Sequence, residues 1–271
     1  HIDPALAADT QSSQIPQLLF EGLTRPDVSG KVQNAVASSV TPSENAQVWT
    51  FKLRDDVKFS NGDPVQPSDF KFAWERAANP KFGSKLAGNF AVISGSEALE
   101  NSGYLSGVVA DDASSTLTVT LNYSFSDFPS LVSLPVFAPV PRKQFTDPLN
   151  QTWDQQSLIG NGPFKLKEAW KPGSNIELVR NDSYYGGPSN KKPYLDGIKF
   201  VVSKDINSAY TDFQGGNGDV GRIPPGQYQA ATNKYGSQVV NDRLLGVEYW
   251  GFNLKDPVVG GDENLPLRQA I

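Results

Sequence analysis

The residues of this chain that could do chemistry are mainly carboxylates. Asp and Glu number 29 among 271 residues, and three adjacent pairs lie beside turn residues: Asp55-Asp56, Asp111-Asp112 and Asp262-Glu263. Two carboxyl groups that face each other across a cleft are the machinery of glycoside hydrolases, and clustered oxygen ligands bind calcium. Because none of the pairs fits the D-x-[DN]-x-[DN]-G calcium pattern, we expect solvated loop charges and no metal site, with the hydrolase as an alternative.

Other catalytic residue types are almost missing from the sequence. The only histidine is His1, and there is no cysteine. Histidine triads, cysteine nucleophiles, zinc clusters, haem ligation and iron–sulfur ligation from the interior of the chain are therefore excluded. The segment 160–165 is not a phosphate loop, because it lacks the GxxxxGK[ST] spacing. Carboxylate chemistry is left open, and no cofactor is expected.

A late segment of the chain has the residue types that line a small-molecule or peptide cleft, which is built from aromatic walls and a few polar groups. We expect a strand over 245–253, in which one of two adjacent aromatic residues can face a cleft while the other packs inside. A pair of core aromatics is the alternative. The candidate ligand contacts in this segment are Glu248, Tyr249, Trp250, Gly251 and Asn253.

A second candidate segment, Asn161 and Gly162, lies in a glycine-containing stretch before a predicted strand. Gly160 and Gly162 permit backbone conformations that other residues avoid. A crossover of this kind between two lobes would suit a hinge, where a few residues absorb a closing rotation. An ordinary tight turn is the alternative.

Composition and periodicity predict a globular protein of the α/β class. The chain is 38% hydrophobic with 11% aromatic residues, and its net charge of -5 argues against general affinity for nucleic acid. Alternating apolar residues predict strands over 48–53, 116–121, 164–167, 175–180, 198–203, 239–240 and 245–253. Helical stripes are centred on Phe70–Ala77, with Ser68 or Asp69 as the cap, and on Ile206–Phe213. Five aromatic residues are expected to form a core: Trp49, Phe51, Phe59, Phe70 and Trp74.

An ordered series of short segments resembles the family 5 extracellular solute-binding proteins, the oligopeptide- and dipeptide-binding receptors of ABC importers. Each segment is weak alone, but their order and spacing extend over essentially the whole chain. The segments are Ile2-Asp3-Pro4, Leu19–Leu23, Trp49–Arg54, Val57–Val65, Asp69-Phe70, Asn161–Leu166, Arg180-Asn181, Tyr184-Tyr185, Phe213 with Gly218-Asp219, and Leu267–Ile271.

The resemblance implies a periplasmic-binding-protein-like fold of type II, with mixed sheets and flanking helices, in three lobes. Residues 1–20 and 142–271 would form a discontinuous first lobe that binds ligand, and residues 21–141 a second lobe inserted into it. Family members are roughly twice as long, so the third lobe is expected to be absent from this chain. The first residue is not Met, so we expect that an upstream segment, of which a signal peptide could have been part, was cut away or left out of this sequence.

The function implied by the resemblance is that of a receptor and not of an enzyme. The protein would capture oligopeptides or dipeptides by hinge closure and deliver them to a membrane permease. The resemblance also implies an extracytoplasmic, monomeric and often lipid-anchored protein. Other family members bind nickel chelates, haem or sugars, and an adhesion or signalling module is a further alternative. By the same resemblance, the backbone after Pro4 runs beside the ligand, where Ala8, Asp9, Thr10 and Gln11 are the candidates. The alternative for Asp9 or Thr10 is capping of the helix that follows.

Overall fold

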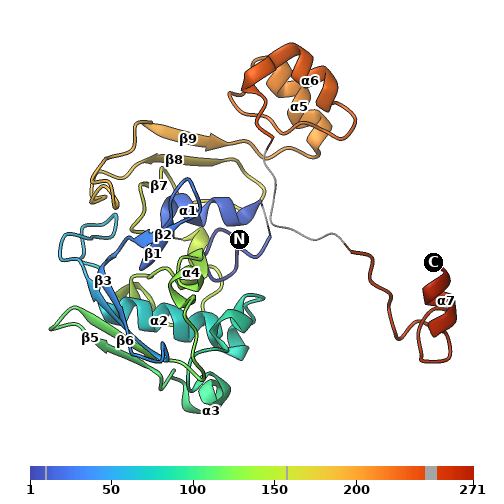
Figure 1. Cartoon of the computed structure of the whole chain (residues 1–271). Coiled ribbons are helices and arrows are strands. Elements are labelled where there is room, and N and C mark those ends of the chain that lie inside the picture. Colours follow the sequence, from blue (N-terminus) through green and yellow to red (C-terminus); the bar gives the residue numbers. More distant parts are fainter. Residues whose placement is uncertain (10, 157, 242–248) are drawn as a thin grey trace. The chain divides into compact units, whose positions relative to one another are not determined.

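The structure is a computed structural model that describes residues 1–9, 11–156, 158–241 and 249–271. The chain divides into two compact units, His1–Val202 and Ser203–Ile271, and each is described here by itself. The expected lobes, residues 1–20 with 142–271 and residues 21–141, stay a prediction. The first unit contains three sheets, and in the described residues of the second unit the regular elements are all helices (Figure 1).

The largest sheet of the first unit has four antiparallel strands in the order β3 (Ala37–Pro42), β4 (Val48–Leu53), β6 (Thr116–Thr120) and β5 (Val108–Asp111). Opposite residues Phe51 and Leu117 are both fully buried, while the threonines of β6 are half-buried on the other face. This is the alternation that the sequence predicted for both strands, and it gives the sheet one apolar face.

Helix α2 (Pro67–Ala78) packs against strands β5 and β6 of this sheet. Its buried stripe contains Phe70 and Trp74, as predicted, and the Trp74 indole donates a hydrogen bond to the Phe137 carbonyl at 2.8 Å. The predicted cap is wrong by two or three residues. Gln66 is the N-cap, and Asp69 accepts its backbone N–H at 2.9 Å in a capping box.

A smaller antiparallel sheet follows later in the first unit, with β8 (Ile176–Arg180) between β7 (Phe164–Leu166) and β9 (Gly197–Phe200). These are three of the predicted strands. β7 and β8 are each one residue shorter than predicted, and β9 begins one residue earlier and ends three residues earlier. A two-stranded ribbon of β1 (Thr24–Pro26) and β2 (Val32–Asn34) completes the strands. The short helices of this unit are α1 (Pro16–Leu19), α3 (Leu99–Ser102) and α4 (Phe128–Leu131).

The second unit contains α5 (Ile206–Gln214), α6 (Tyr228–Tyr235) and α7 (Leu265–Ala270). The predicted helical stripe after β9 is therefore confirmed, and Asp205 caps it by accepting the backbone N–H groups of Asn207 and Ser208. The predicted strand over 239–240 is wrong, and the strand predicted over 245–253 is wrong in its described part, 249–253, because neither segment is extended in a ladder. Residues 245–248 of that prediction lie outside the described residues. A short apolar run forms a strand only where a neighbouring strand pairs with it.

The fold class is nevertheless the predicted one, α/β with sheets flanked by helices, and every strand pairing recorded for the described residues is antiparallel. All five aromatic residues expected in the core are buried. Within the described residues, no helix has the length and apolar character that crossing a membrane requires.

Candidate functional site

The N-terminal candidate segment is exposed and held in a defined turn. The Asp9 carboxylate accepts the backbone N–H groups of Gln11 at 3.1 Å and Ser12 at 2.8 Å, and the Ser12 bonds hold the pKa of Asp9 below its usual value. Ala8, Asp9 and Gln11 all face solvent. Asp9 thus caps the turn before α1, as the alternative interpretation has it, and its neighbours stay accessible to a ligand. Thr10 lies outside the described residues.

Residues just before this turn are anchored by a buried ion pair. Asp3 binds Arg76 of α2 through both carboxylate oxygens, at 2.6 and 3.1 Å, and both side chains are buried. Arg76 also donates to the carbonyl oxygens of Pro148 at 3.0 Å and Asn150 at 2.8 Å. A bidentate pair of this kind fixes geometry as well as charge, so the segment leading to Ala8 has a rigid base.

Asn161 is fully buried, and its amide is used within the chain. It donates to the Glu21 carbonyl at 2.9 Å and accepts the Glu21 backbone N–H at 3.0 Å. A side chain at Gly160 or Gly162 would overlap the backbone of Leu19, which shows how closely the two chain segments approach. The geometry favours a locked junction over a hinge at this point, and ligand contact by Asn161 and Gly162 stays a prediction.

The late candidate segment belongs to the second unit and is strongly exposed. Tyr249 and Trp250 are 84% and 98% exposed, Gly251 is exposed, and Glu248 lies outside the described residues. Asn253 accepts the backbone N–H of Lys255 at 3.1 Å. The segment 249–253 is not a strand, and both aromatic side chains are exposed. The expectation that one of them packs inside is therefore wrong, and so is the alternative that both lie in the core.

A buried polar cluster around Glu21 escaped the sequence analysis. Glu21 accepts the Tyr184 hydroxyl at 3.1 Å and the Arg25 guanidinium at 2.9 Å, and the Arg54 guanidinium lies 5.0 Å from the ring of Tyr185. Burial, reinforced by the negative charge of Glu21, raises the pKa of both tyrosines above the usual value. Glu21 and the two tyrosines stand in the quoted motifs, but nothing in their spacing reveals that they meet.

Three of the loop carboxylates, Asp56, Asp111 and Asp112, are bound within the chain. Asp56 binds Arg54 at 2.9 Å, Asp111 closes a turn by accepting backbone N–H groups, and Asp112 accepts from the Ser68 hydroxyl at 2.7 Å. No cluster of three or more metal-binding side chains occurs in the described part of the chain. These carboxylates support neither of the chemistries considered for them above.

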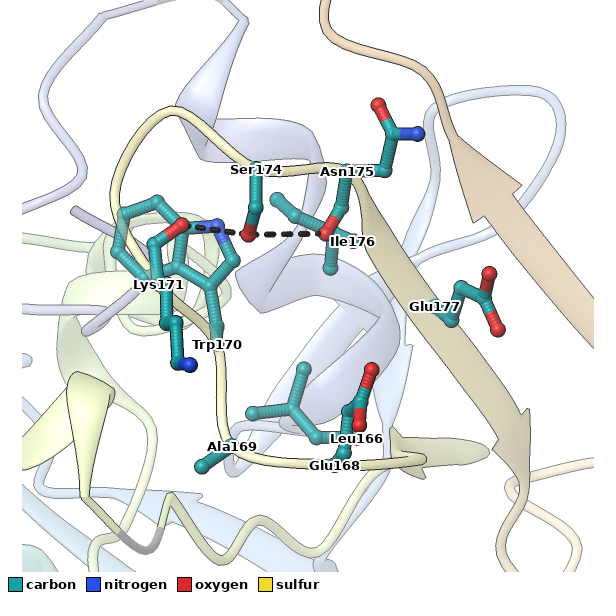
Figure 2. A pocket seen from close by; sticks show the side chains of 9 residues that line it. All are labelled: Leu166, Glu168, Ala169, Trp170, Lys171, Ser174, Asn175, Ile176 and Glu177. Carbon is teal, nitrogen blue, oxygen red and sulfur yellow. Dashed lines mark hydrogen bonds between the residues drawn. The ribbon is translucent and has the colours of Figure 1, made fainter.

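Two pockets lie in the first unit, and they differ in their acidic residues. The smaller, of about 270 Å³, lies beside the end of α2 and has Glu97 as its single acidic residue. The larger, of about 320 Å³, contains Glu168 and Glu177 (Figure 2). Glu177 is hydrogen-bonded to Lys167, which has the larger effect, and to Lys199, and both hold the pKa of Glu177 below its usual value. Because a general acid needs a raised pKa, Glu177 does not suit that role.

Comparison with known proteins assigns the fold to one group of receptors. The chain is 32% identical to the oligopeptide-binding protein OppA of Bacillus subtilis over its whole length, and 35% identical to the dipeptide-binding protein DppE of the same organism over 82% of the chain. These alignments cover 49% and 40% of the two relatives. The chain thus spans about half the length of the curated relatives it matches.

Solved structures agree with this assignment. OppA of Burkholderia pseudomallei superposes with a TM-score of 0.77 at 29% identity, over 88% of this chain and 47% of that one. The unliganded open form of the murein tripeptide-binding protein MppA gives 0.77 at 28% identity, over 87% and 45%. The sequence model of a protein family, the bacterial extracellular solute-binding proteins, family 5 Middle, matches residues 31–271 of this chain. The chain belongs to this family of binding proteins.

Proposed function

We propose that this chain forms lobes one and two of a three-lobed receptor, the substrate-binding subunit of an ABC importer for oligopeptides or dipeptides. The observation that carries the proposal is the alignment of the whole chain with the oligopeptide-binding protein OppA, together with the match to DppE. In this proposal the protein works outside the cytoplasm, as a monomer with a lipid anchor, and delivers its ligand to a membrane permease.

The proposed ligand contacts are the two exposed segments. Ala8, Asp9 and Gln11 lie exposed on an anchored turn. The N–H groups of Ala8 and Gln11 bond within the chain, so in this proposal carbonyl oxygens of the turn accept from the N–H groups of an extended peptide, without reading its side chains. Tyr249 and Trp250 offer aromatic surface, with Gly251 and Asn253 beside them. Fully exposed aromatic side chains are costly to keep in water, which supports a role for this pair in contacting a ligand or a further lobe.

The proposed mechanism is closure of a third lobe over ligand held on the first. Ligand that touches both lobes only when they are shut shifts the population toward the closed form by its differential affinity. The locked junction around Asn161 supports placing this rotation elsewhere in the protein. It follows that the 271-residue chain by itself binds peptide weakly.

A non-peptide solute is the second candidate. The chain is 27% identical to a protein named as a probable deoxycholate-binding periplasmic protein, YgiS of Escherichia coli, so members similar to this chain differ in their ligands. The lack of an internal histidine disfavours direct coordination of nickel, whereas a chelate or a sugar would use other contacts.

Mass spectrometry of the longer, three-lobed protein tests the proposed function. Protein purified without added ligand is denatured, and the released small molecules are identified. A ladder of short peptides would establish a peptide receptor and its length range, whereas a bile acid, a sugar or a metal chelate would contradict the peptide assignment.

Calorimetry with the 271-residue chain tests the lobe assignment. A pentapeptide should bind weakly, and Trp250→Ala should weaken this binding further, while Tyr194→Ala, a change at another strongly exposed aromatic residue, should not. Nanomolar binding by the chain alone would contradict the proposal that the third lobe is required.

A further inference from the structure

Three Asn-Gly dipeptides occur in the sequence, beginning at Asn61, Asn161 and Asn217. An asparagine followed by glycine can modify itself, because the glycine backbone nitrogen can attack the side-chain amide carbon and close a five-membered ring. Glycine permits this approach since it lacks a Cβ and has the widest range of backbone conformations. The attack needs an accessible side-chain amide and a backbone N–H that is free of hydrogen bonds. The surroundings of each dipeptide therefore decide whether it reacts.

The dipeptide Asn161-Gly162 is protected by the junction described above. Asn161 is fully buried, and its amide bonds to the Glu21 backbone at 2.9 and 3.0 Å. The Gly162 N–H donates to the Leu19 carbonyl at 2.9 Å. Reaction here would first require this part of the core to open, which costs a large share of the global stability. Asn161 should therefore stay intact in the folded chain.

The dipeptide Asn61-Gly62 is exposed, but its reacting groups are bonded. The Asn61 amide donates to the Asp63 carboxylate at 2.8 Å and accepts the Asp63 backbone N–H at 3.1 Å. The Gly62 N–H donates to the Phe59 carbonyl at 2.9 Å. Because the Gly62 nitrogen must leave this bond before it can reach the Asn61 amide carbon, the turn slows the reaction.

The dipeptide Asn217-Gly218 is exposed in the loop that follows α5, and its reacting groups are free. Within the residues that the structure describes, neither the Asn217 side chain nor the Gly218 N–H has a hydrogen-bond partner. The Asn217 backbone N–H donates to the Asp212 carbonyl at 2.9 Å, which holds the loop against the last turn of α5. Residues 217–219 repeat the Asn-Gly-Asp sequence of residues 61–63, so only their surroundings distinguish the two sites.

We propose that Asn217 is a site of spontaneous deamidation, with water as the only co-reactant. The Gly218 nitrogen loses its proton to solvent and bonds to Cγ of Asn217, and the side-chain nitrogen takes up a proton and leaves as ammonia. Water then opens the succinimide ring at either carbonyl, which gives aspartate or isoaspartate. The product carries a new negative charge at the C-terminal end of α5, where the helix dipole disfavours it. The site does not rest on the peptide-binding function proposed above.

Peptide mass spectrometry of the folded chain, aged in mildly alkaline ¹⁸O-water, tests this proposal. Ring opening takes one oxygen from solvent, so the heavy isotope marks the products that form during the incubation. We expect labelled aspartate and isoaspartate to accumulate first at Asn217. Asn61 should react more slowly by roughly two- to tenfold, the effect of one hydrogen bond on an equilibrium, and Asn161 should stay intact. In chain unfolded by urea, the rates at Asn61 and Asn217 should converge, because their local sequences match.

Two variants complete the test. A Cβ at Gly218 would meet only the Val220 carbonyl, at 4.0 Å, so Gly218→Ala should fold normally. This variant should slow the reaction at Asn217 and leave the rate at Asn61 unchanged. Asn217→Gln, whose longer side chain cannot close a five-membered ring, should give no labelled product at that position. The proposal is overturned if Asn217 stays intact, if Asn61 reacts as fast as Asn217 in the folded chain, or if aspartate forms without isoaspartate.

Discussion

At the scale of single residues, the polar side chains buried in the first unit decide how its segments are held. Asp3 and Asn161 are fully buried, and each bonds to residues distant in the sequence. A buried polar group costs free energy unless it is hydrogen-bonded, so each of these side chains specifies one arrangement of the backbone. The anchored turn at Asp9 depends on this specification.

Removing Arg76 should be strongly destabilising, because Asp3 would remain as an uncompensated buried charge. We expect Arg76→Met to lower the free energy of unfolding by about 3–5 kcal/mol, measured by urea denaturation of the whole chain. Arg54→Met, which breaks the partly exposed pair with Asp56, is the matched control and should cost about 1 kcal/mol or less. Equal losses in the two variants would contradict a fixed anchor at Asp3.

The Tyr184–Tyr185 pair should make the protein sensitive to alkali. Burial raises the pKa of both hydroxyls above the ordinary 10.0, so above pH 10 the folded state keeps protons that the unfolded chain has released. The free energy of unfolding should therefore fall as pH rises above 10, as denaturation at a series of pH values would show. No such fall would argue against burial of these hydroxyls.

Tyr185→Phe should reduce this alkaline loss and stabilise the protein at neutral pH. The Tyr185 hydroxyl is buried near the Glu21 carboxylate but makes no hydrogen bond of good geometry among the residues described, so its removal should add about 1 kcal/mol. Tyr194→Phe changes an exposed tyrosine and should leave both quantities unchanged. A less stable Tyr185→Phe variant would show that the hydroxyl has a partner in solution.

At the scale of elements, two distant chain segments are joined as one structural piece. The segment from Leu19 to Glu21 meets the segment from Gly160 to Gly162 through backbone and Asn161 bonds, including Gly162 N–H to the Leu19 carbonyl at 2.9 Å. Glycine is required here because the backbones approach too closely for a side chain. The junction is therefore a brace between elements.

Gly160→Ala tests this brace at the element scale. The new Cβ would overlap the Leu19 carbonyl, so we expect a loss of at least 1–3 kcal/mol, seen as a lower midpoint of thermal unfolding. Gly88→Ala, where nothing lies within 4 Å, should change stability by about 0.5 kcal/mol or less. A harmless Gly160→Ala would mean that the two segments separate readily, as a hinge requires.

At the scale of the whole molecule, the two units differ in how much apolar surface they bury. The first has an aromatic core that includes Phe51, Phe70 and Trp74, whereas in the described part of the second only Tyr210 and Ala231 are buried hydrophobic residues. Buried apolar area is the main source of stability. The two units should consequently differ in their resistance to local opening.

Hydrogen–deuterium exchange should reveal this difference. We expect amides of β4 and β6 to be the best protected and those of α5 and α6 to exchange much faster, because protection follows local stability. Peptide-resolved mass spectrometry of the whole chain gives both rates in one experiment. Equal protection of the two units would contradict the uneven distribution of the core.

The sequence by itself determined the family, the class of fold and the strongly periodic elements. Strands β4 and β6, helices α2 and α5 and the aromatic core could be predicted because local spacing decides which face of an element is apolar. Tertiary structure alone decided the bonds of Glu21 and Asn161, the ion pair of Asp3 and the absence of strands at 239–240 and 249–253. Each of these features depends on residues far apart in the sequence. The local sequence around one residue does not determine which distant residue it contacts.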